Sequence, residues 1–264
     1  MNFQLPGGLS LPETAGTEVV SFVLVMGRVA PLFLLAPIFS ASLLAQRAKF
    51  LAAFAIAIAL TPIASQGKTI PTDPMIFALT LAQEVGIGLA FALALGALAA
   101  AVTAGASLVD TLVGFSFGAL IDPMTGNSNG VLGQVYSLFA MMIFVVFGGM
   151  GLMIMGLAQT YTLIPLGMFP TTNALAAIAL HSLEQVPVIG LELAAPVLIA
   201  VVVADAVFGL IARAVPQMNV LVLGLPAKVL LAFAVVGASL PFVGQHLQDD
   251  LSHTIGSALQ AFNH

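Results

Sequence analysis

The chain has 264 residues, of which 60% are hydrophobic and only 6% are charged, with a formal net charge of −5. Because soluble domains carry about 25% charged residues, this composition excludes an ordinary soluble domain. The absence of cysteine excludes disulfides and thiolate metal sites, and no basic cluster indicates nucleic-acid binding. A mean hydropathy of +1.14 instead predicts an all-α, polytopic membrane protein.

The apolar runs follow one another along the chain in lengths that suit membrane helices. Residues 1–17 form a polar segment without the basic start and apolar centre of a signal peptide, so we expect none there. A helix needs about 20 apolar residues to cross a bilayer, and backbone groups in an apolar medium must bond within their own helix. We therefore predict about six long helices in a single helical domain, residues 1–264. The expected ranges are Val19–Phe39, Phe50–Ser65, Met75–Val109, Val131–Pro165, Val186–Ile211 and Val220–Gly244.

Small residues recur in the third of these runs, at Gly86, Gly88, Gly96 and Gly105. Small residues let helix backbones approach closely, either within the chain or against other subunits. The fourth run lies in a stretch without any charged residue or histidine, between Asp122 and His181. We expect either one long bent helix there or a hairpin that folds at residues 147–151, and the sequence leaves both open.

The segment Gly114–Gly118 reads G-F-S-F-G and matches the G-x-S-x-G pattern of serine hydrolases. That pattern acts as a nucleophile elbow only when a strand precedes it in an α/β sheet. Here the preceding run, Ala97–Val113, is rich in small residues and predicts a helix. We therefore interpret the match at Ser116 as chance, and we expect no enzyme activity, catalytic residue, metal or cofactor.

The residues around this motif include glycines, a proline and large apolar side chains, which a chance match to a hydrolase pattern does not explain. Glycines loosen the backbone, and Asp122-Pro123 disfavours helix at Asp122 and suits the start of a new one. Residues 113–130 are then either a plain connector between two helices or an apolar loop that seals a lumen. The second role is physically possible because apolar constrictions gate pores by dewetting. The candidate seal residues are Gly114, Phe115, Phe117, Gly118, Leu120, Ile121, Asp122 and Pro123.

Ionisable and amide residues inside apolar helices are costly and usually functional. The chain has eight candidates for polar contacts between helices or subunits: Arg28, Glu84, Asp110, Asp205, Arg213, Gln217, Asn219 and Lys228. The charged ones either pair or cap helix ends, or they form part of a proton path. Asp205 and Arg213 are separated by about 12 Å along a helix and do not share a face, so we do not expect them to pair.

Pro216 is expected to end the helix that carries Arg213. Gln217 and Asn219 then satisfy freed backbone groups, or they form a hydrogen-bond clamp between subunits, which is the interpretation we favour.

The C-terminal segment, residues 245–264, has the pattern of an amphipathic helix. Its apolar side chains recur four residues apart beside acidic residues and a histidine. Such a helix lies on a bilayer or on a partner, and the sequence does not distinguish these. The apolar stripe consists of Leu247, Leu251, Ile255 and Leu259.

Four motifs resemble the FliR family of type III secretion export gates. The first is Ser116-Phe117-Gly-Ala-Leu-Ile-Asp122-Pro123 in mid-chain, and the second is the stretch Arg28–Phe39 followed by Arg47-Ala-Lys49. The third is Gln83–Phe91. The fourth and most specific is Pro216-Gln-Met-Asn219-Val-Leu-Val-Leu-Gly-Leu-Pro226-Ala-Lys228. The likeness runs from about residue 18 to the tail in the order of the family.

The resemblance implies a role in protein export. Members assemble with FliP and FliQ into a helical pore in the bacterial inner membrane, at the flagellar basal body, with FlhB around its entrance. Unfolded flagellar subunits pass through this pore, and the family's mid-chain loop belongs to a plug that seals the closed channel. Carried onto this chain, that loop is about residues 114–126, and its glycines would let the segment move.

Two alternatives remain open at this stage. The injectisome counterpart of FliR shares the fold and mechanism, and a single sequence does not separate it from the flagellar protein. A secondary transporter for a small solute would also use buried charges and proline-broken helices. Transporters often repeat their broken helices in both halves, but Pro31 and Pro37 early in the chain and Pro216 and Pro226 late in it make no convincing repeat.

Overall fold

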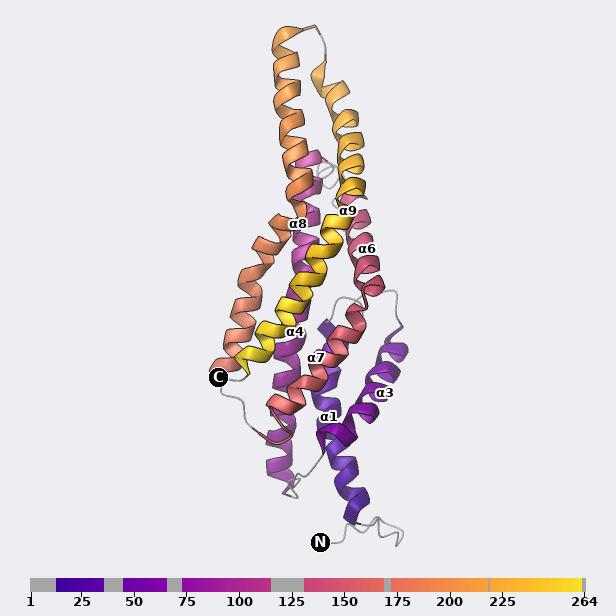
Figure 1. Ribbon diagram of the computed structural model, residues 1–264, viewed down its shortest axis with the longest axis vertical. Helices are drawn as coiled ribbons and strands as arrows, with labels where there is room; N and C mark the ends of the chain where they lie inside the picture. The colour runs from indigo at the N-terminus through magenta and orange to yellow at the C-terminus, as the bar shows by residue number, and fades with distance from the viewer. Residues whose placement is uncertain are drawn as a thin grey trace. The chain divides into compact units, whose positions relative to one another are not determined.

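The computed structural model describes residues 13–35, 45–65, 73–114, 131–168, 172–217 and 219–262. All regular secondary structure in these ranges is helical, which confirms the all-α prediction (Figure 1). The described ranges contain seven helices, which Figure 1 labels with gaps in the numbering. They are α1 (Glu13–Leu35), α3 (Gln46–Ala64), α4 (Pro74–Val113), α6 (Val131–Val146), α7 (Gly149–Leu163), α8 (Thr172–Ala214) and α9 (Val220–Ala261).

Five of the described helices are long and apolar enough to cross a membrane, and α6 and α7 together make a sixth candidate span. The chain bends by 64° between α6 and α7, where Gly148 has a φ of +71° that favours glycine. The stretch without charged residues therefore forms two helices with a break at residues 147–148, which fits a broken span or a re-entrant loop.

Two helices, α8 and α9, are much longer than the sequence predicted, while α4 extends the long run predicted from Met75 to Val109 by only a few residues at its ends. Helices α4, α8 and α9 contain 40, 43 and 42 residues, so each is about 60 Å long at a rise of 1.5 Å per residue. A hydrocarbon core is only about 30 Å thick. The predicted start of α8 at Val186 was wrong by 14 residues, because the polar residues before it continue the helix beyond the apolar run. Pro187 also lies inside this helix.

The described residues cluster into two compact units. Unit 1 comprises residues 1–96, 150–183 and 253–264, and unit 2 comprises residues 97–149 and 184–252. Helices α4, α8 and α9 contribute to both units, while α1 and α3 belong to unit 1 and α6 belongs to unit 2.

Unit 1 is built on close contacts of α1 with α3 and α4. The ring of Phe22 meets the ring of Phe54 edge to face, with 5.1 Å between centroids. A Cβ atom at Gly88 would lie only 2.1 Å from the backbone oxygen of Arg28. Helices α1 and α4 therefore touch through their backbones, and only glycine fits at residue 88. This is one of the close approaches within the chain that the small residues predicted.

Three of the four residues of the C-terminal stripe are buried within the chain itself, and the fourth, Leu259, is half-buried. Residues 245–261 continue α9 without a break, and Leu247, Leu251 and Ile255 are all at most 9% exposed. In unit 1, a Cβ atom at Gly156 of α7 would meet side-chain atoms of Ile255 and Phe91, each at 2.9 Å. The chain's own residues therefore cover these three side chains. The sequence had led us to expect a bilayer or a partner in that place.

Unit 2 contains a second close helix crossing and an antiparallel helix pair. A Cβ atom at Gly105 of α4 would lie 2.4 Å from the backbone oxygen of Gly190 of α8. The hydroxyl of Tyr136 on α6 donates a hydrogen bond of 2.6 Å to the Leu193 carbonyl on α8, three residues before Pro196. The end of α8 and the start of α9 run side by side in opposite directions (Figure 1).

Candidate functional site

The most deeply buried charges of the described residues form an ion pair in unit 1. Arg28 on α1 and Glu84 on α4 have 0% and 1% exposed side chains, and Arg28 Nε donates to Glu84 Oε2 at 2.6 Å. Buried charges are tolerated only when they are paired and hydrogen-bonded. The close approach of α1 and α4 at Gly88 brings the two side chains within reach.

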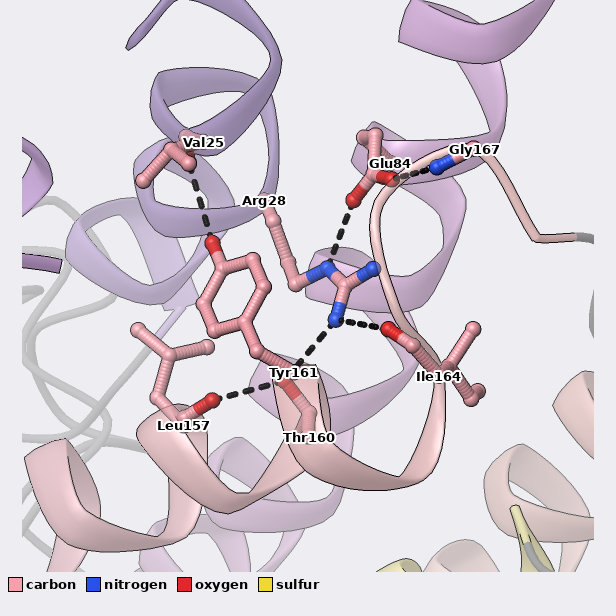
Figure 2. A network of polar contacts seen from close by, with 8 residues as sticks. All are labelled: Val25, Arg28, Glu84, Leu157, Thr160, Tyr161, Ile164 and Gly167. Carbon is pink, nitrogen blue, oxygen red and sulfur yellow. Dashed lines mark hydrogen bonds and ion pairs between the residues drawn. The ribbon is translucent and has the colours of Figure 1, made fainter. Parts of the chain in front are cut away.

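Further contacts join the guanidinium to the end of α7, as Figure 2 shows. Arg28 Nη1 donates to Thr160 Oγ1 at 3.2 Å and to the Ile164 carbonyl at 3.0 Å. The Tyr161 ring lies 4.2 Å from Arg28 Cζ in a cation–π contact. A cation at the C-terminal end of a helix also interacts favourably with the helix dipole. Arg28 thus satisfies carbonyl and hydroxyl groups where α7 ends.

Glu84 completes this network from the other side. Its Oε1 accepts the backbone N–H of Gly167 at 3.3 Å (Figure 2), and Gly167 has a φ of +80°. The ion pair therefore holds the turn at residues 164–168, which separates α7 from α8, against α1 and α4. We name Arg28, Glu84, Thr160, Tyr161, Ile164 and Gly167 the buried network.

Asp110 is a buried carboxylate in unit 2, only 3% exposed, in the last turn of α4. Its Oδ2 accepts the backbone N–H of Gly133 in the first turn of α6 at 2.8 Å. The first N–H groups of a helix have no partner within the helix, so this carboxylate caps α6.

Asp205 on α8 and Lys228 on α9 form a second ion pair, also in unit 2. It is more open than the pair in unit 1, since the side chains are 45% and 20% exposed. Arg213, in the last turn of α8, is exposed and lies eight residues from Asp205. The partner of Asp205 is therefore a residue on the neighbouring helix.

The polar residues between α8 and α9 are exposed. Helix α8 ends at Ala214, two residues before Pro216. Asn219 Oδ1 accepts the N–H of Val222 at 3.4 Å, and its carbonyl accepts the same N–H at 3.1 Å. Asn219 thus satisfies a free amide at the start of α9, which is the structural role considered from the sequence. Gln217 lies at this junction as an exposed residue.

Most of the predicted seal lies outside the described residues. This holds for Ser116 and for Phe115, Phe117, Gly118, Leu120, Ile121, Asp122 and Pro123. Gly114 is described, and its φ of +103° ends α4 in a conformation that favours glycine. Across the described ranges, no three His, Asp or Glu side chains gather in a way that could hold a metal ion.

Several residues of these sites were missed from the sequence. Tyr136, Thr160 and Tyr161 donate hydrogen bonds to backbone carbonyls inside the protein, and Gly133 and Gly167 offer backbone N–H groups to carboxylates. A signal was present for the tyrosines, because the chain has only two. A phenol that is buried in an apolar protein needs a partner for its hydroxyl. No comparable signal distinguishes these glycines among the 25 in the chain.

Long apolar helices with buried, paired charges define a polytopic helical membrane protein. The family model "Bacterial export proteins, family 1" matches residues 19–254. The chain belongs to this family, and the resemblance predicted from the sequence motifs is confirmed.

Individual relatives agree with the family. The flagellar biosynthetic protein FliR of Escherichia coli (strain K12) is 27% identical over 237 residues, which cover 88% of this chain and 90% of the relative. FliR of Bacillus subtilis (strain 168) is also 27% identical, over 81% of this chain and 83% of the relative. The surface presentation of antigens protein SpaR of Shigella sonnei is 29% identical over 49% of this chain and 50% of the relative.

Proposed function

We propose that this chain is a non-enzymatic subunit of the flagellar type III export gate in the bacterial inner membrane. The observation that carries the proposal is the family match over residues 19–254, with FliR relatives that align over most of both chains. In this role the chain helps to form the pore through which unfolded flagellar subunits leave the cell.

The partners in this proposal are FliP-like and FliQ-like pore subunits and an FlhB-like protein. Uncovered apolar side chains on the helices of unit 2 support an assembly with other apolar surfaces. On α8, Val202 and Val203 are 56% and 57% exposed, and on α9 Leu230 is 72% exposed. Large contiguous apolar surfaces face lipid or other proteins. Helices of about 60 Å also exceed the thickness of a bilayer, so part of this surface needs another cover.

The segment 114–126 acts in this proposal as part of the seal of the closed pore. Its apolar side chains, Phe115, Phe117, Leu120 and Ile121, exclude water and ions by dewetting a narrow lumen. Gly114, with a φ of +103°, ends α4 just before this segment. Replacing Phe117 with alanine should raise the leakage of small ions and leave assembly unchanged, and unchanged leakage would contradict the seal.

Co-purification tests the assembly. The chain is expressed in mild detergent with the FliP-like and FliQ-like proteins of its own source, and separately without them. The proposal predicts a stable complex of defined mass that contains all three proteins. A chain that remains a well-behaved monomer or symmetric dimer and ignores both proteins would overturn it.

A second candidate is the counterpart of this subunit in an injectisome. The match to SpaR favours it, at 29% identity. Coverage favours the flagellar proposal only slightly, because FliR of Escherichia coli aligns over 88% of this chain and SpaR of Salmonella typhimurium over 80%. The identity of the exported proteins separates the two candidates.

A further inference from the structure

The middle of α8 in unit 2 has an inner face that its own chain covers. Leu193 and Val197 on this face are both 0% exposed. A Cβ atom at Gly190 would lie 2.8 Å from the backbone oxygen of Ala101 on α4, so the two helices touch there. The chain's own packing thus accounts for this side of α8, and the opposite side needs a separate explanation.

The opposite side of α8 is an apolar stripe with one charge in its middle. Val188, Glu192, Ile199 and Val203 follow one another at intervals of four, seven and four residues, which places them on one face of a helix. The three apolar side chains are 54%, 65% and 57% exposed, and Glu192 is exposed between them. We name these four residues the outer stripe.

The described residues supply no cation for the carboxylate of the outer stripe. Within the described ranges, the side chain of Glu192 makes neither a hydrogen bond nor an ion pair. Lys228 of α9 already pairs with Asp205, and Arg213 lies 21 residues beyond Glu192, about 31 Å along α8. Glu192 thus differs from Glu84 and Asp205, whose charges are compensated within the chain.

Three environments could cover the outer stripe, and only one suits all of its residues. Lipid tails suit Val188, Ile199 and Val203 but not a carboxylate, which is costly in hydrocarbon. Water suits Glu192 but leaves the apolar side chains uncovered, and uncovered apolar surface marks contact sites. A helix of another protein covers the apolar side chains, and one basic residue on it compensates the charge.

We propose that the outer stripe binds an apolar helix of a neighbouring subunit, and that this helix places a lysine or arginine against Glu192. The inference rests on the proposed function, in which the chain assembles with FliP-like and FliQ-like subunits. The basic residue sets the register of the partner helix. A helix shifted by one turn would leave two opposite charges unpaired in an apolar contact, which is strongly unfavourable.

Co-purification with both partner proteins tests the charge. E192K places like charges together, so we expect at least about tenfold less complex than with the wild type. E192Q keeps the size of the side chain and should lose less. The matched control is E184K, because Glu184 is exposed on the same helix beside the polar residues His181 and Gln185. The yield of complex with E184K should equal that of the wild type.

A charge reversal in the partner separates pairing from general destabilisation. In the E192K background, each lysine or arginine in the apolar helices of the FliP-like and FliQ-like proteins is replaced with glutamate in turn. One of these replacements should restore the complex, which a merely destabilised chain would not allow. If every replacement fails to restore it, the proposed pair is overturned.

Thiol labelling distinguishes a partner helix from water, because the chain has no native cysteine. In the assembled complex, a water-soluble maleimide should react with E184C and not with E192C. Rapid labelling of E192C in the complex would show a water-filled space at the outer stripe and would overturn the inference.

The wild-type complex separates this inference from the proposed function. If the wild-type chain assembles with both partners and E192K assembles equally well, the role of Glu192 is overturned and the proposed function stands. If the wild-type chain ignores both partners, the proposed function and the role of Glu192 are both overturned.

Discussion

Two ion pairs among the described residues join helices in opposite circumstances. Arg28 and Glu84 in unit 1 are fully buried and share their remaining hydrogen bonds with α7 and the turn after it. Asp205 and Lys228 in unit 2 are partly exposed, on helices that also carry uncovered apolar side chains such as Val202 and Leu230. The first pair thus depends only on its own chain, while the second lies where a partner or solvent can reach it.

This difference shows how the protein uses its few charges. A buried pair stabilises a structure only when its surroundings satisfy the remaining donors and acceptors. Unit 1 supplies partners for Arg28 Nη1 and Glu84 Oε1 from Thr160, Ile164 and Gly167, while Arg28 Nη2 is buried without a hydrogen bond to any described residue. A partly exposed pair contributes little where water screens it. We therefore expect the stability of the isolated chain to depend on the pair in unit 1 far more than on the pair in unit 2.

The largest effect should follow from removing one partner of the buried pair. E84L leaves the Arg28 guanidinium charged and without its carboxylate, which costs about 3–5 kcal/mol for a buried pair. The measurement is thermal or denaturant unfolding of the purified chain in detergent. The double variant R28M/E84L should lose less than E84L alone, because no uncompensated charge remains. Equal losses would contradict the assignment of the cost to a stranded charge.

The contact of α1 with α4 should be sensitive to a single methyl group. G88A forces a Cβ atom against the Arg28 backbone oxygen, and overpacking of this kind typically costs about 1–3 kcal/mol. The matched control is G86A on the same helix, where the nearest atom to a Cβ would be Leu175 Cδ1 at 3.8 Å. G86A should be neutral or stabilising, since alanine favours helix over glycine. If both variants unfold alike, the close backbone contact is not a stability determinant.

A single buried hydrogen bond in unit 2 tests how much one polar contact between helices stabilises the isolated chain. Y136F removes the hydroxyl that donates to the Leu193 carbonyl at 2.6 Å, which should cost about 1 kcal/mol. Y161F removes a longer contact, of 3.4 Å to the Val25 carbonyl, and keeps the ring that lies beside Arg28. It should cost less than Y136F in the same unfolding assay, and the reverse order would contradict the account.

The exposed pair should give the smallest effect. K228A and D205A are each expected to change the stability of the isolated chain by less than about 1 kcal/mol, and added salt should reduce the difference further. The measurement is unfolding at low and high ionic strength. A loss as large as that of E84L would remove the distinction between the two pairs.

The sequence predicted the class of fold well because apolar runs leave the backbone no alternative to helix. It predicted the ends of helices poorly, since polar residues before Val186 continue α8 instead of ending it. It also identified the charged residues that need partners, such as Arg28 and Glu84, but not which ones pair.

The pairing partners depend on which helix faces meet, and this is set by contacts between distant residues. Arg28 and Glu84 are 56 residues apart, and Arg28 and Ile164 are 136 apart. Gly88 was noted as a small residue that allows close packing, and its contact with the Arg28 backbone explains how the pair forms. The hydrogen bond of Gly133 to Asp110 uses a backbone N–H, which every non-proline residue has, so no residue type marks it.

Export of flagellar proteins is the most direct test of the central claim. The gene for this chain is deleted in its own source, and flagellar subunits secreted into the medium are quantified with and without a restored copy. The account predicts that secretion is lost on deletion and returns with the wild-type chain. Undiminished secretion of flagellar subunits in the deletion strain would contradict the proposal that this chain is part of the flagellar export gate.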